Sequence, residues 1–393
     1  MGVRTLRRYV MGEATFPGRC RGAPRGGTWQ ASTTIAKGSE SVAAGPQSTP
    51  SNSAGGSSVF RYRDASVLAV SAVDAPEIVT SAQIDERLAP AYEHAGLRGG
   101  MLEQLAGIVE RRWWPTDVTF ADAAAMAGAK ALAEAGVDPA DVGLLIDTSV
   151  CRERLEPSAS VDVHRQLGIS TACMNFDLSN ACLGFLSGMQ LAATMIDAGQ
   201  IDYALIVDGE GSRYTQQVTI DRLNAGGATR EDILENFATF TLGSGGAAMV
   251  LGRASLHSQG HRFVGGVTRA ATEYNQLCLG DLEGMRTDSR ALLEAAVILA
   301  RDTWTDARDH FDWDDLDMYV IHQVSKMHTE AITRALDIDP QRVPQSFPTR
   351  GNIGPASIPF TLALNAEGLT PGDRIACMGI GSGLNSAVIE IQW

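Results

Sequence analysis

Two stretches of this chain resemble two later stretches, and they occur in the same order. Residues 137–147 (VDPADVGLLID) and 311–321 (FDWDDLDMYVI) each place an acidic loop before a short apolar run. Residues 199–207 (GQIDYALIV) are in the same way similar to residues 372–379 (GDRIACMG). Such an ordered pair of repeats predicts a duplicated α/β unit of roughly 160 residues. The fold class that we expect is therefore α/β, with two similar layered halves.

Strands and helices alternate in the first half. Apolar runs predict strands at residues 65–73, 144–149, 172–177 and 203–208. Helical patterns cover residues 81–96, 119–136 and 182–198, with Ser81 as the cap of the first helix and Gly136 as the stop of the second. Residues 215–240 are more polar and predict irregular helices, in an insertion over the site.

The first 62 residues differ in composition from the rest. They are rich in Gly, Ser, Arg and Pro, which predicts a disordered tail or linker. We expect an N-terminal half over residues 63–255 and a C-terminal half over residues 256–393. Residues 1–59 hold seven Lys or Arg against two Glu, although the whole chain has a net charge of −14. The body is therefore strongly acidic, which argues against nucleic acid as a partner.

Cysteine usage and the longest apolar run bear on location. The six cysteines show no CxxC and no paired spacing, which favours reduced thiols in a cytoplasmic protein. The first twenty residues lack the apolar stretch of a secretory signal. The apolar run from Ala181 to Ala198 contains Ser187, Gln190 and Asp197, so we interpret it as a core helix rather than a membrane span.

Cys182 is the strongest candidate for a nucleophile. It lies where the strand at 172–177 gives way to the long apolar helix. A thiol at the first turn of a helix faces unpaired backbone N–H groups at the positive end of the helix dipole. This setting favours the thiolate, which is the nucleophilic form of cysteine. We expect the other five cysteines to lie in the core or the tail.

His322 and Asn352 are the other candidate site residues. His322 ends a predicted apolar strand, and Asn352 precedes a predicted helix. In layered α/β folds, sites form beyond the ends of strands, so these residues and Cys182 are expected to converge. Cys, His and Asn together suit acyl transfer through a thiol. His328, six residues after His322, does not have the spacing of a metal ligand, so no metal site is expected.

Four motifs resemble the thiolase superfamily and, within it, the ketoacyl-carrier-protein synthase III branch. They are NACLGF at 180–185, IHQ at 321–323, GNIGPASIP at 351–359 and GIGSGLN at 379–385. The resemblance covers residues 65–393 and implies a thiolase fold with duplicated αβαβα halves. Residues 149–158 (SVCRERLEPS) and 267–275 (VTRAATEYN) are most similar to the olefin-biosynthesis condensing enzymes, which join two long acyl-CoA molecules head to head.

The resemblance implies a role for each site residue. Cys182 would carry the first acyl group, with the backbone N–H groups of Cys182 and Ser382 as its oxyanion hole. His322 and Asn352 would stabilise the enolate of a second acyl-CoA. Glu156, reaching in from the partner subunit of a homodimer, would remove the α-proton, and Glu153 is the alternative base. No cofactor is implied beyond the CoA thioester substrates, and downstream olefin-pathway enzymes are possible partners.

The sequence leaves other functions open. A decarboxylative 3-oxoacyl synthase, which starts fatty acid or polyketide chains with malonyl-carrier protein, usually has Ala-Asn after His-Gln and Thr-Ser after Gly-Asn. This chain has Val324-Ser325 and Ile353-Gly354-Pro355 instead. Lys326 and Arg334 could bind a carrier or CoA phosphate, or could simply be solvated. A papain-like protease shares the order Cys, His, Asn, but its cysteine signature is missing. A non-catalytic thiolase-like subunit would have lost the Cys or the His.

Overall fold

The computed structural model describes residues 56–393, so residues 1–55 of the tail predicted for residues 1–62 lie outside this range. The strands are β1 Ser58–Arg61, β2 Ala65–Asp74, β3 Glu77–Thr80, β4 Glu110–Trp113, β5 Leu144–Asp147, β6 Met174–Asp177, β7 Tyr203–Glu210, β8 Gly245–Arg253, β9 His261–Ala270, β10 Cys278–Asp281, β11 Gly284–Thr287, β12 Met318–Ile321, β13 Arg374–Gly381 and β14 Asn385–Gln392. The α-helices are α1 Ser81–Arg87, α2 Ala89–His94, α3 Met101–Ala106, α4 Phe120–Ala135, α5 Ala159–Leu167, α6 Gly184–Asp197, α7 Arg213–Asn224, α8 Arg230–Glu235, α9 Phe237–Thr241, α10 Ser289–Ala307, α11 Lys326–Ala335, α12 Phe347–Arg350 and α13 Ser357–Asn365.

The two halves pair their strands in the same way. In the first half, β5 runs parallel to β7, and β7, β8 and β2 follow as antiparallel neighbours. In the second half, β12 runs parallel to β13, and β13, β14 and β9 follow as antiparallel neighbours. The two halves meet where β2 pairs with β9 through Ser66 and Val67. The sequence repeats thus fall on equivalent strands, β5 with β12 and β7 with β13.

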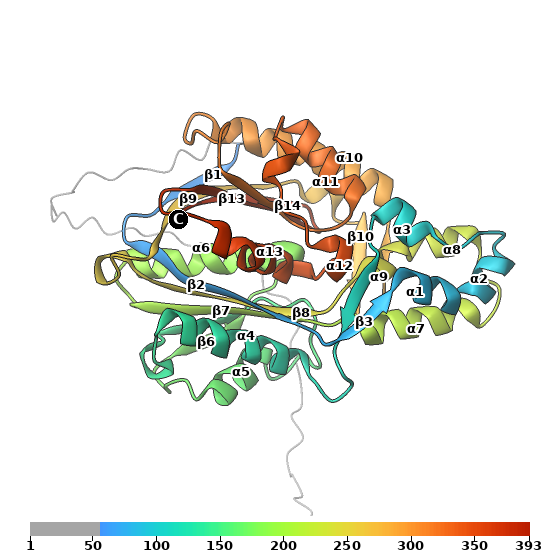
Figure 1. The fold of residues 1–393 in the computed structure, drawn as a ribbon, viewed down its shortest axis with the longest axis horizontal. Coiled ribbons are helices and arrows are strands. Elements are labelled where there is room, and N and C mark those ends of the chain that lie inside the picture. Colours follow the sequence, from blue (N-terminus) through green and yellow to red (C-terminus); the bar gives the residue numbers. More distant parts are fainter. Residues whose placement is uncertain (1–55) are drawn as a thin grey trace, which may run out of the picture. The chain divides into compact units, whose positions relative to one another are not determined.

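Five layers are visible in Figure 1, with α10 and α11 above, α4 and α5 below, and α6 and α13 between the two sheet halves. Alternation along the strands explains this arrangement, because successive side chains point to opposite faces. In β7, Ile206 packs into the central core around α6, whereas Leu205 packs against α4. In β13, Cys377 faces the same central core, whereas Met378 packs under α10 and α11. The predicted layered α/β fold is confirmed.

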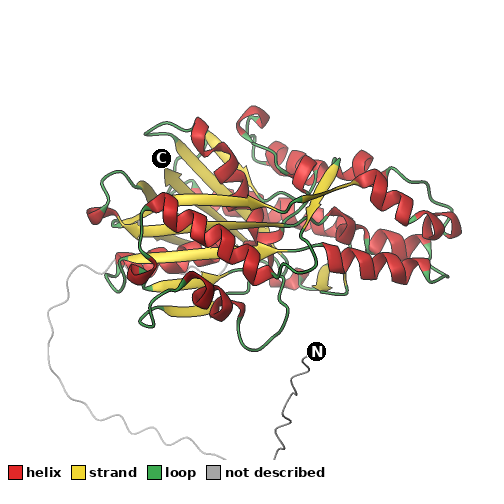
Figure 2. Ribbon diagram, turned by 60° about the horizontal axis from the view of Figure 1, so that its bottom comes forward, coloured by secondary structure: helices red, strands yellow, loops and turns green. Residues whose placement is uncertain are grey.

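A helical lobe lies beside the layers, at the right of Figures 1 and 2. Its apolar core joins residues 79–113 to residues 220–240, which include the predicted irregular helices. Two expectations here differ from the structure. Thr80, not Ser81, caps α1. The Thr80 side chain accepts from the Gln83 N–H, and the Gln83 side chain accepts from the Thr80 N–H. The predicted helix over 81–96 is also divided at Leu88, because a separate helix begins at Ala89 with Pro90 in its first turn.

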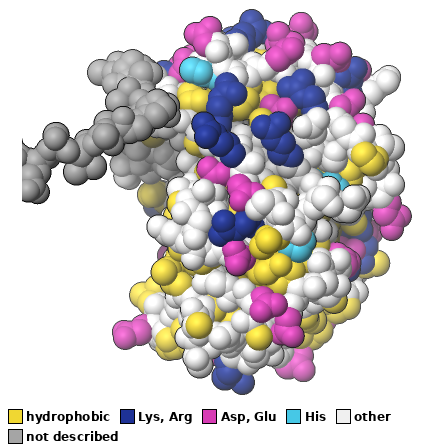
Figure 3. Space-filling model, turned by 90° about the vertical axis from the view of Figure 1, so that its left-hand side faces the viewer, with side chains coloured by type: hydrophobic (Ala, Val, Ile, Leu, Met, Phe, Trp, Pro, Cys, Tyr) yellow, Lys and Arg dark blue, Asp and Glu magenta, His cyan; other side chains and the backbone are white. Residues whose placement is uncertain are grey.

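Two further boundaries are corrected or refined. Ser58–Arg61, which the sequence placed in the tail, form strand β1 and pair antiparallel with β9. The apolar run that begins at Ala181 forms α6 in the central core, as expected. Within the described residues, no helix is both long and apolar enough to cross a membrane. On the face shown in Figure 3, Lys and Arg side chains are interspersed with Asp and Glu. That face therefore lacks the uniformly basic patch of a nucleic-acid-binding surface.

Candidate active site

Cys182 lies in a sharp turn between β6 and α6. The turn is the short 3₁₀ helix η2 (Ala181–Leu183), in which Ala181 has a φ of +45°, a left-handed value that is strained for a residue with a side chain. Gly184 begins α6 so close to β5 that an added Cβ would lie 2.8 Å from the Thr148 carbonyl oxygen. Packing against the sheet therefore holds Cys182 at the start of the helix, half-buried.

The ionisation of Cys182 differs from the expectation. Burial is the largest effect and raises the pKa of the Cys182 thiol to about 12, with Cys278, Glu210 and Asp208 adding to the rise. A helix terminus favours the thiolate by a smaller amount than the loss of water disfavours it. Burial therefore opposes the thiolate that the helix terminus favours, and the raised pKa of Cys182 disagrees with the expectation of a favoured thiolate.

The pH dependence of thiol reactivity tests this conclusion. Because only the thiolate reacts, the rate of Cys182 alkylation by iodoacetamide should rise about tenfold per pH unit between about pH 7 and pH 10, without a plateau. The rate is measured by intact-protein mass spectrometry, with Cys182→Ala as the blank for other thiols. A plateau below about pH 8 would mean that the helix terminus dominates.

His322 follows β12 and is held by its backbone, since its N–H donates to the Met378 carbonyl over 2.8 Å. The side chain is 3% exposed, and neither ring nitrogen has a partner among the described residues. Burial, together with nearby His328, lowers the pKa of His322 to about 3. The imidazole is therefore neutral at any working pH, with one N–H to donate and one nitrogen to accept.

Asn352 is held by its own backbone and side chain. Its N–H donates to the Thr241 carbonyl and its carbonyl accepts from the Gly243 N–H, each over 2.8 Å. Its Oδ1 accepts from the Gly354 N–H at 3.0 Å. Because that bond fixes the planar amide, the donating Nδ2 must face away from Gly354. Asn352 is 7% exposed, and the bond from Gly354 fixes the orientation of its amide.

The segments that carry Cys182, His322 and Asn352 meet at one place, as the sequence predicted. Strand β13 lies against the segments that carry Cys182 and His322. Its Met378 carbonyl accepts from the His322 N–H, and an added Cβ on Gly381 would lie 3.1 Å from the backbone nitrogen of Leu183. Segment η2, which contains Cys182, also lies against η6 (Gly354–Ala356), just after Asn352.

The predicted oxyanion loop adjoins the cysteine turn. Ser382 is half-buried in the turn between β13 and β14. Two side-chain hydrogen bonds connect the turn to the cysteine segment. Asn385 Nδ2 donates to Asn180 Oδ1 at 3.1 Å, and Asn180 Nδ2 donates to Ser187 Oγ at 3.0 Å. The backbone N–H groups of Cys182 and Ser382 thus belong to neighbouring segments, and their joint role as an oxyanion hole stays a prediction.

Glu156 lies on an exposed loop, residues 150–158, rather than in the core. The neighbouring Leu155 is 95% exposed. Glu153, the alternative base, is already engaged, because its carboxylate accepts from the Phe120 N–H at the start of α4. Lys326 pairs with Glu330 one turn along α11, at 4.0 Å, which agrees with a solvated helix face.

The sequence analysis missed three buried carboxylates, two of which, Asp208 and Glu210, lie near Cys182. They are Asp147 at the end of β5, and Asp208 and Glu210 at the end of β7, and all three are almost fully buried. Burial raises the pKa of Asp147 to about 6, and it raises the pKa of Asp208 and of Glu210 as well. The sequence signal that could have revealed them is an acidic residue directly at the end of an apolar strand. In the described residues, no cluster of His, Cys, Asp and Glu could hold a metal ion.

Comparison with known families gives two matches along the chain. Residues 176–271 match the family model for 3-oxoacyl-[acyl-carrier-protein] synthase III, and residues 307–393 match the model for the C-terminal part of the same enzymes. The first match includes the Cys182 segment, and the second includes His322 and Asn352.

Individual relatives extend this similarity over the described body. The acyl-CoA:acyl-CoA alkyltransferase of Xanthomonas campestris pv. campestris is 45% identical, over 84% of this chain and 99% of that protein. The enzyme of the same name from Shewanella oneidensis is 37% identical, over 81% of this chain and 96% of that protein. A β-ketoacyl-[acyl-carrier-protein] synthase III of Geobacillus kaustophilus is 28% identical, over 73% of this chain and 87% of that protein.

Solved structures give the same result. A crystal structure of Xanthomonas campestris OleA, altered at a histidine, superposes with a TM-score of 0.83 at 44% identity, covering 85% of this chain and 99% of that chain. A cysteine-to-serine form with bound lauric acid and lauroyl-CoA also scores 0.83 at 44% identity, covering 84% of this chain and all of that one. Other solved forms are altered at a glutamate.

Proposed function

The chain belongs to the 3-oxoacyl-[acyl-carrier-protein] synthase III family of thiolase-fold condensing enzymes, and on this basis we propose that it joins two fatty acyl-CoA molecules without decarboxylation. The observation that carries the proposal is the 45% identity, over nearly the whole length of the relative, to an acyl-CoA:acyl-CoA alkyltransferase. The relatives named as carrier-protein synthases have a much lower identity, 28% for that of Geobacillus kaustophilus.

The first half-reaction is acyl transfer to Cys182. Its sulfur attacks the thioester carbonyl of one acyl-CoA, the carbon–sulfur bond to CoA breaks, and the thiol proton leaves with CoA. The backbone N–H groups of Cys182 and Ser382 donate hydrogen bonds to the carbonyl oxygen as negative charge develops on it. This covalent intermediate separates one difficult condensation into two easier steps.

The second half-reaction forms the carbon–carbon bond. A carboxylate removes the α-proton of the second acyl-CoA, and its thioester oxygen becomes an enolate oxygen. The neutral His322 N–H and the Asn352 amide donate to that oxygen, and each such donor contributes about 10²–10³ in rate. The α-carbon then attacks the acyl group on Cys182, the carbon–sulfur bond to Cys182 breaks, and a β-keto product results.

The carboxylate is Glu156 of the partner subunit in a homodimer. Support comes from the exposed loop that carries Glu156, in which Leu155 is 95% exposed and thus suited to an apolar interface. The loop is fastened to β6, since Arg152 pairs with Asp177 at 3.4 Å. Strand β6 is the edge of the sheet, and Met174 on it is 53% exposed. An unpaired edge of this kind is a ready surface for a second copy.

Mixed dimers test whether the site is shared. Cys182→Ala and Glu156→Ala subunits are co-expressed with different affinity tags, and the mixed dimer is purified through both. Each parent variant should be inactive, whereas the mixed dimer should recover about half of the wild-type activity, because one of its two sites is intact. A mixed dimer as inactive as its parents would contradict a base supplied in trans.

Substrate requirement tests the reaction itself. The protein is incubated with myristoyl-CoA alone, and the products are analysed by mass spectrometry. A β-keto product of doubled chain length is expected, either as its CoA thioester or, after water hydrolyses that thioester, as the β-keto acid and the ketone that the acid forms on losing CO2. An acylated Cys182 that gives product only after malonyl-carrier protein is added would instead identify the decarboxylative synthase.

The proposal has consequences for cofactors, partners and location. The steps above use CoA thioesters and protein groups, with no metal, flavin or nicotinamide. Enzymes that act on β-keto products in an olefin pathway are the expected partners, with an acyl carrier protein as the partner in the decarboxylative alternative. A cytoplasmic location, indicated by the cysteine usage of the chain, completes the proposal.

A further inference from the structure

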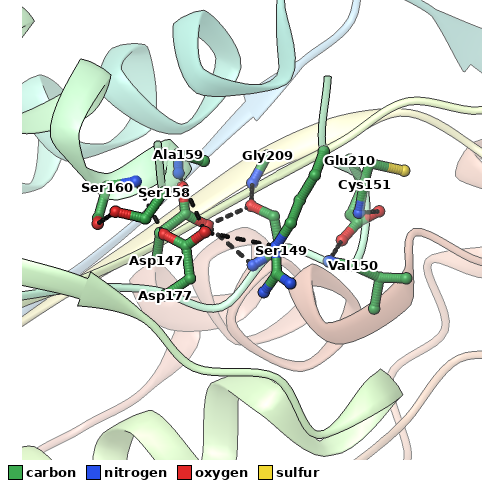
Figure 4. A network of polar contacts seen from close by, with 11 residues as sticks. Asp147, Ser149, Val150, Cys151, Ser158, Ala159, Ser160, Asp177, Gly209 and Glu210 are labelled. Atoms are coloured by element: carbon green, nitrogen blue, oxygen red, sulfur yellow. Dashed lines mark hydrogen bonds and ion pairs between the residues drawn. The ribbon is translucent and has the colours of Figure 1, made fainter. Parts of the chain in front are cut away.

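Glu210 holds the start of the loop that carries Glu156. It is the last residue of β7 and is only 5% exposed. One carboxylate oxygen accepts from the Val150 N–H at 2.6 Å, and the other accepts from the Cys151 N–H at 3.3 Å. Figure 4 shows Glu210 beside these two residues. Both oxygens of a buried carboxylate thus serve two successive N–H groups of one loop.

A second carboxylate holds the other end of the same loop. Asp177, at the end of β6, accepts from the Ala159 N–H at 3.0 Å and from the Ser160 N–H at 2.9 Å (Figure 4). Between the two anchors, residues 153–157 are exposed. The loop therefore projects from a base fixed at both ends by acidic side chains, and Glu156 lies in the projecting part.

Glu210 also borders the nucleophile site of its own subunit. An added Cβ on Gly354, two residues after Asn352, would lie 3.3 Å from the carboxyl carbon of Glu210. Its own backbone carbonyl accepts from Trp114 Nε1 at 3.0 Å, which fixes the end of β7. Glu210 is thus rigidly placed between the Asn352 segment and the Glu156 loop.

A carboxylate is an expensive side chain at this position. Asp208 precedes it by two residues on β7, and both are buried. Loss of water raises the pKa of Glu210, so keeping it ionised costs free energy that an apolar residue would not. What the carboxylate offers, and what an apolar residue or an amide cannot, is two acceptors for two adjacent N–H groups.

We propose that Glu210 is a positioning residue, which orients the loop of residues 150–158 so that Glu156 enters the site of the partner subunit. This inference rests on the proposed function, in which Glu156 removes the α-proton in trans. Glu210 touches neither substrate nor the reacting atoms in this account. It acts through Val150 and Cys151 on the second half-reaction, while its charge also helps to raise the pKa of the Cys182 thiol.

Glu210→Gln is the variant to test, because it keeps the shape but loses one of the two acceptors. Acylation of Cys182 by myristoyl-CoA, followed by intact-protein mass spectrometry, should not fall, because removing a charge that raises the pKa of Cys182 cannot disfavour its thiolate. Condensation should fall by about a hundredfold, the usual cost of misplacing a reacting group by about 1 Å. Equal losses in acylation and condensation would indicate general damage to the fold and would overturn the proposal.

Mixed dimers separate the loop from the neighbouring nucleophile site. Starting from the Cys182→Ala and Glu156→Ala pair, Glu210→Gln is added to only one subunit at a time. On the Cys182→Ala subunit, which supplies Glu156, it should reduce condensation about a hundredfold. On the Glu156→Ala subunit, which supplies Cys182, it should not reduce condensation. An equal loss in both arms, a loss only in the second arm, or no loss in either arm would contradict the proposal.

The parent pair distinguishes this inference from the function on which it rests. If the mixed dimer is inactive before Glu210 is changed, base supply in trans has failed, and the positioning role fails with it. If the parent pair is active, the positioning role is decided by the two mixed dimers that carry Glu210→Gln. Glu134→Gln, on the surface of α4, is the matched control for the amide substitution and should leave both arms unchanged.

Discussion

Alanine in place of Cys182 is expected to abolish condensation and to leave the protein without a bound acyl group. The sulfur is the only atom of that side chain that can form the thioester, and removal of a catalytic nucleophile commonly costs about 10⁴-fold or more. The measurement is the intact mass of the protein after incubation with myristoyl-CoA, together with the yield of product. Folding should be preserved, because Cys182 is half-buried and the change removes one atom.

Cys278→Ala is the matched control for that experiment. Cys278 lies close enough to Cys182 to influence its ionisation, and its sulfur accepts a hydrogen bond from Thr287 Oγ1 at 3.5 Å. This variant should still gain one acyl mass and should still condense. If the Cys182→Ala protein gained an acyl mass and the Cys278→Ala protein did not, the nucleophile would be Cys278.

Glutamine in place of Glu156 is expected to stop the reaction at the acyl-enzyme. Removing an α-proton needs a base, and loss of a positioned general base commonly costs about 10²–10⁴ in rate. Acylation needs no such base, so Cys182 should still gain the acyl mass and release one CoA. Time courses of CoA release and of product therefore separate the two half-reactions: one CoA per subunit in a burst, then almost no product.

Glu153→Gln is the control for the glutamate experiment. It lies three residues earlier in the same loop, but its carboxylate accepts from the Phe120 N–H at the start of α4. Its loss should lower the free energy of unfolding by about 1 kcal/mol and leave condensation nearly unchanged. If Glu153→Gln blocked condensation and Glu156→Gln did not, the base would be Glu153.

The layered fold could be predicted because its signals are local. An acidic loop followed by a buried apolar strand is visible in residues 137–147 and again in 311–321, and these became β5 and β12. The helix over 120–135 was also predictable, since Thr119 and Gly136 cap it through neighbouring residues. Strand β1 was missed because its partner β9 lies about 200 residues away in sequence, and only tertiary pairing defines it.

The convergence of the candidate segments was predictable, but their electrostatics were not. Motifs placed Cys182, His322 and Asn352, and the structure brings their segments together. The ionisation of Cys182 depends on burial and on Asp208 and Glu210, which come from another strand. A single sequence gives no sign that β7 ends beside the cysteine turn. The anchoring of the loop by Glu210 depends on the same long-range placement.

Competition between the two possible second substrates tests the central claim most directly. The protein is given myristoyl-CoA and malonyl-carrier protein together, at equal concentrations, and the condensed products are identified by mass. A β-keto product built from two myristoyl chains, with the malonyl-carrier protein unchanged, is the expected result. A carrier-bound β-keto chain two carbons longer than myristoyl, with no doubled product, would contradict the account.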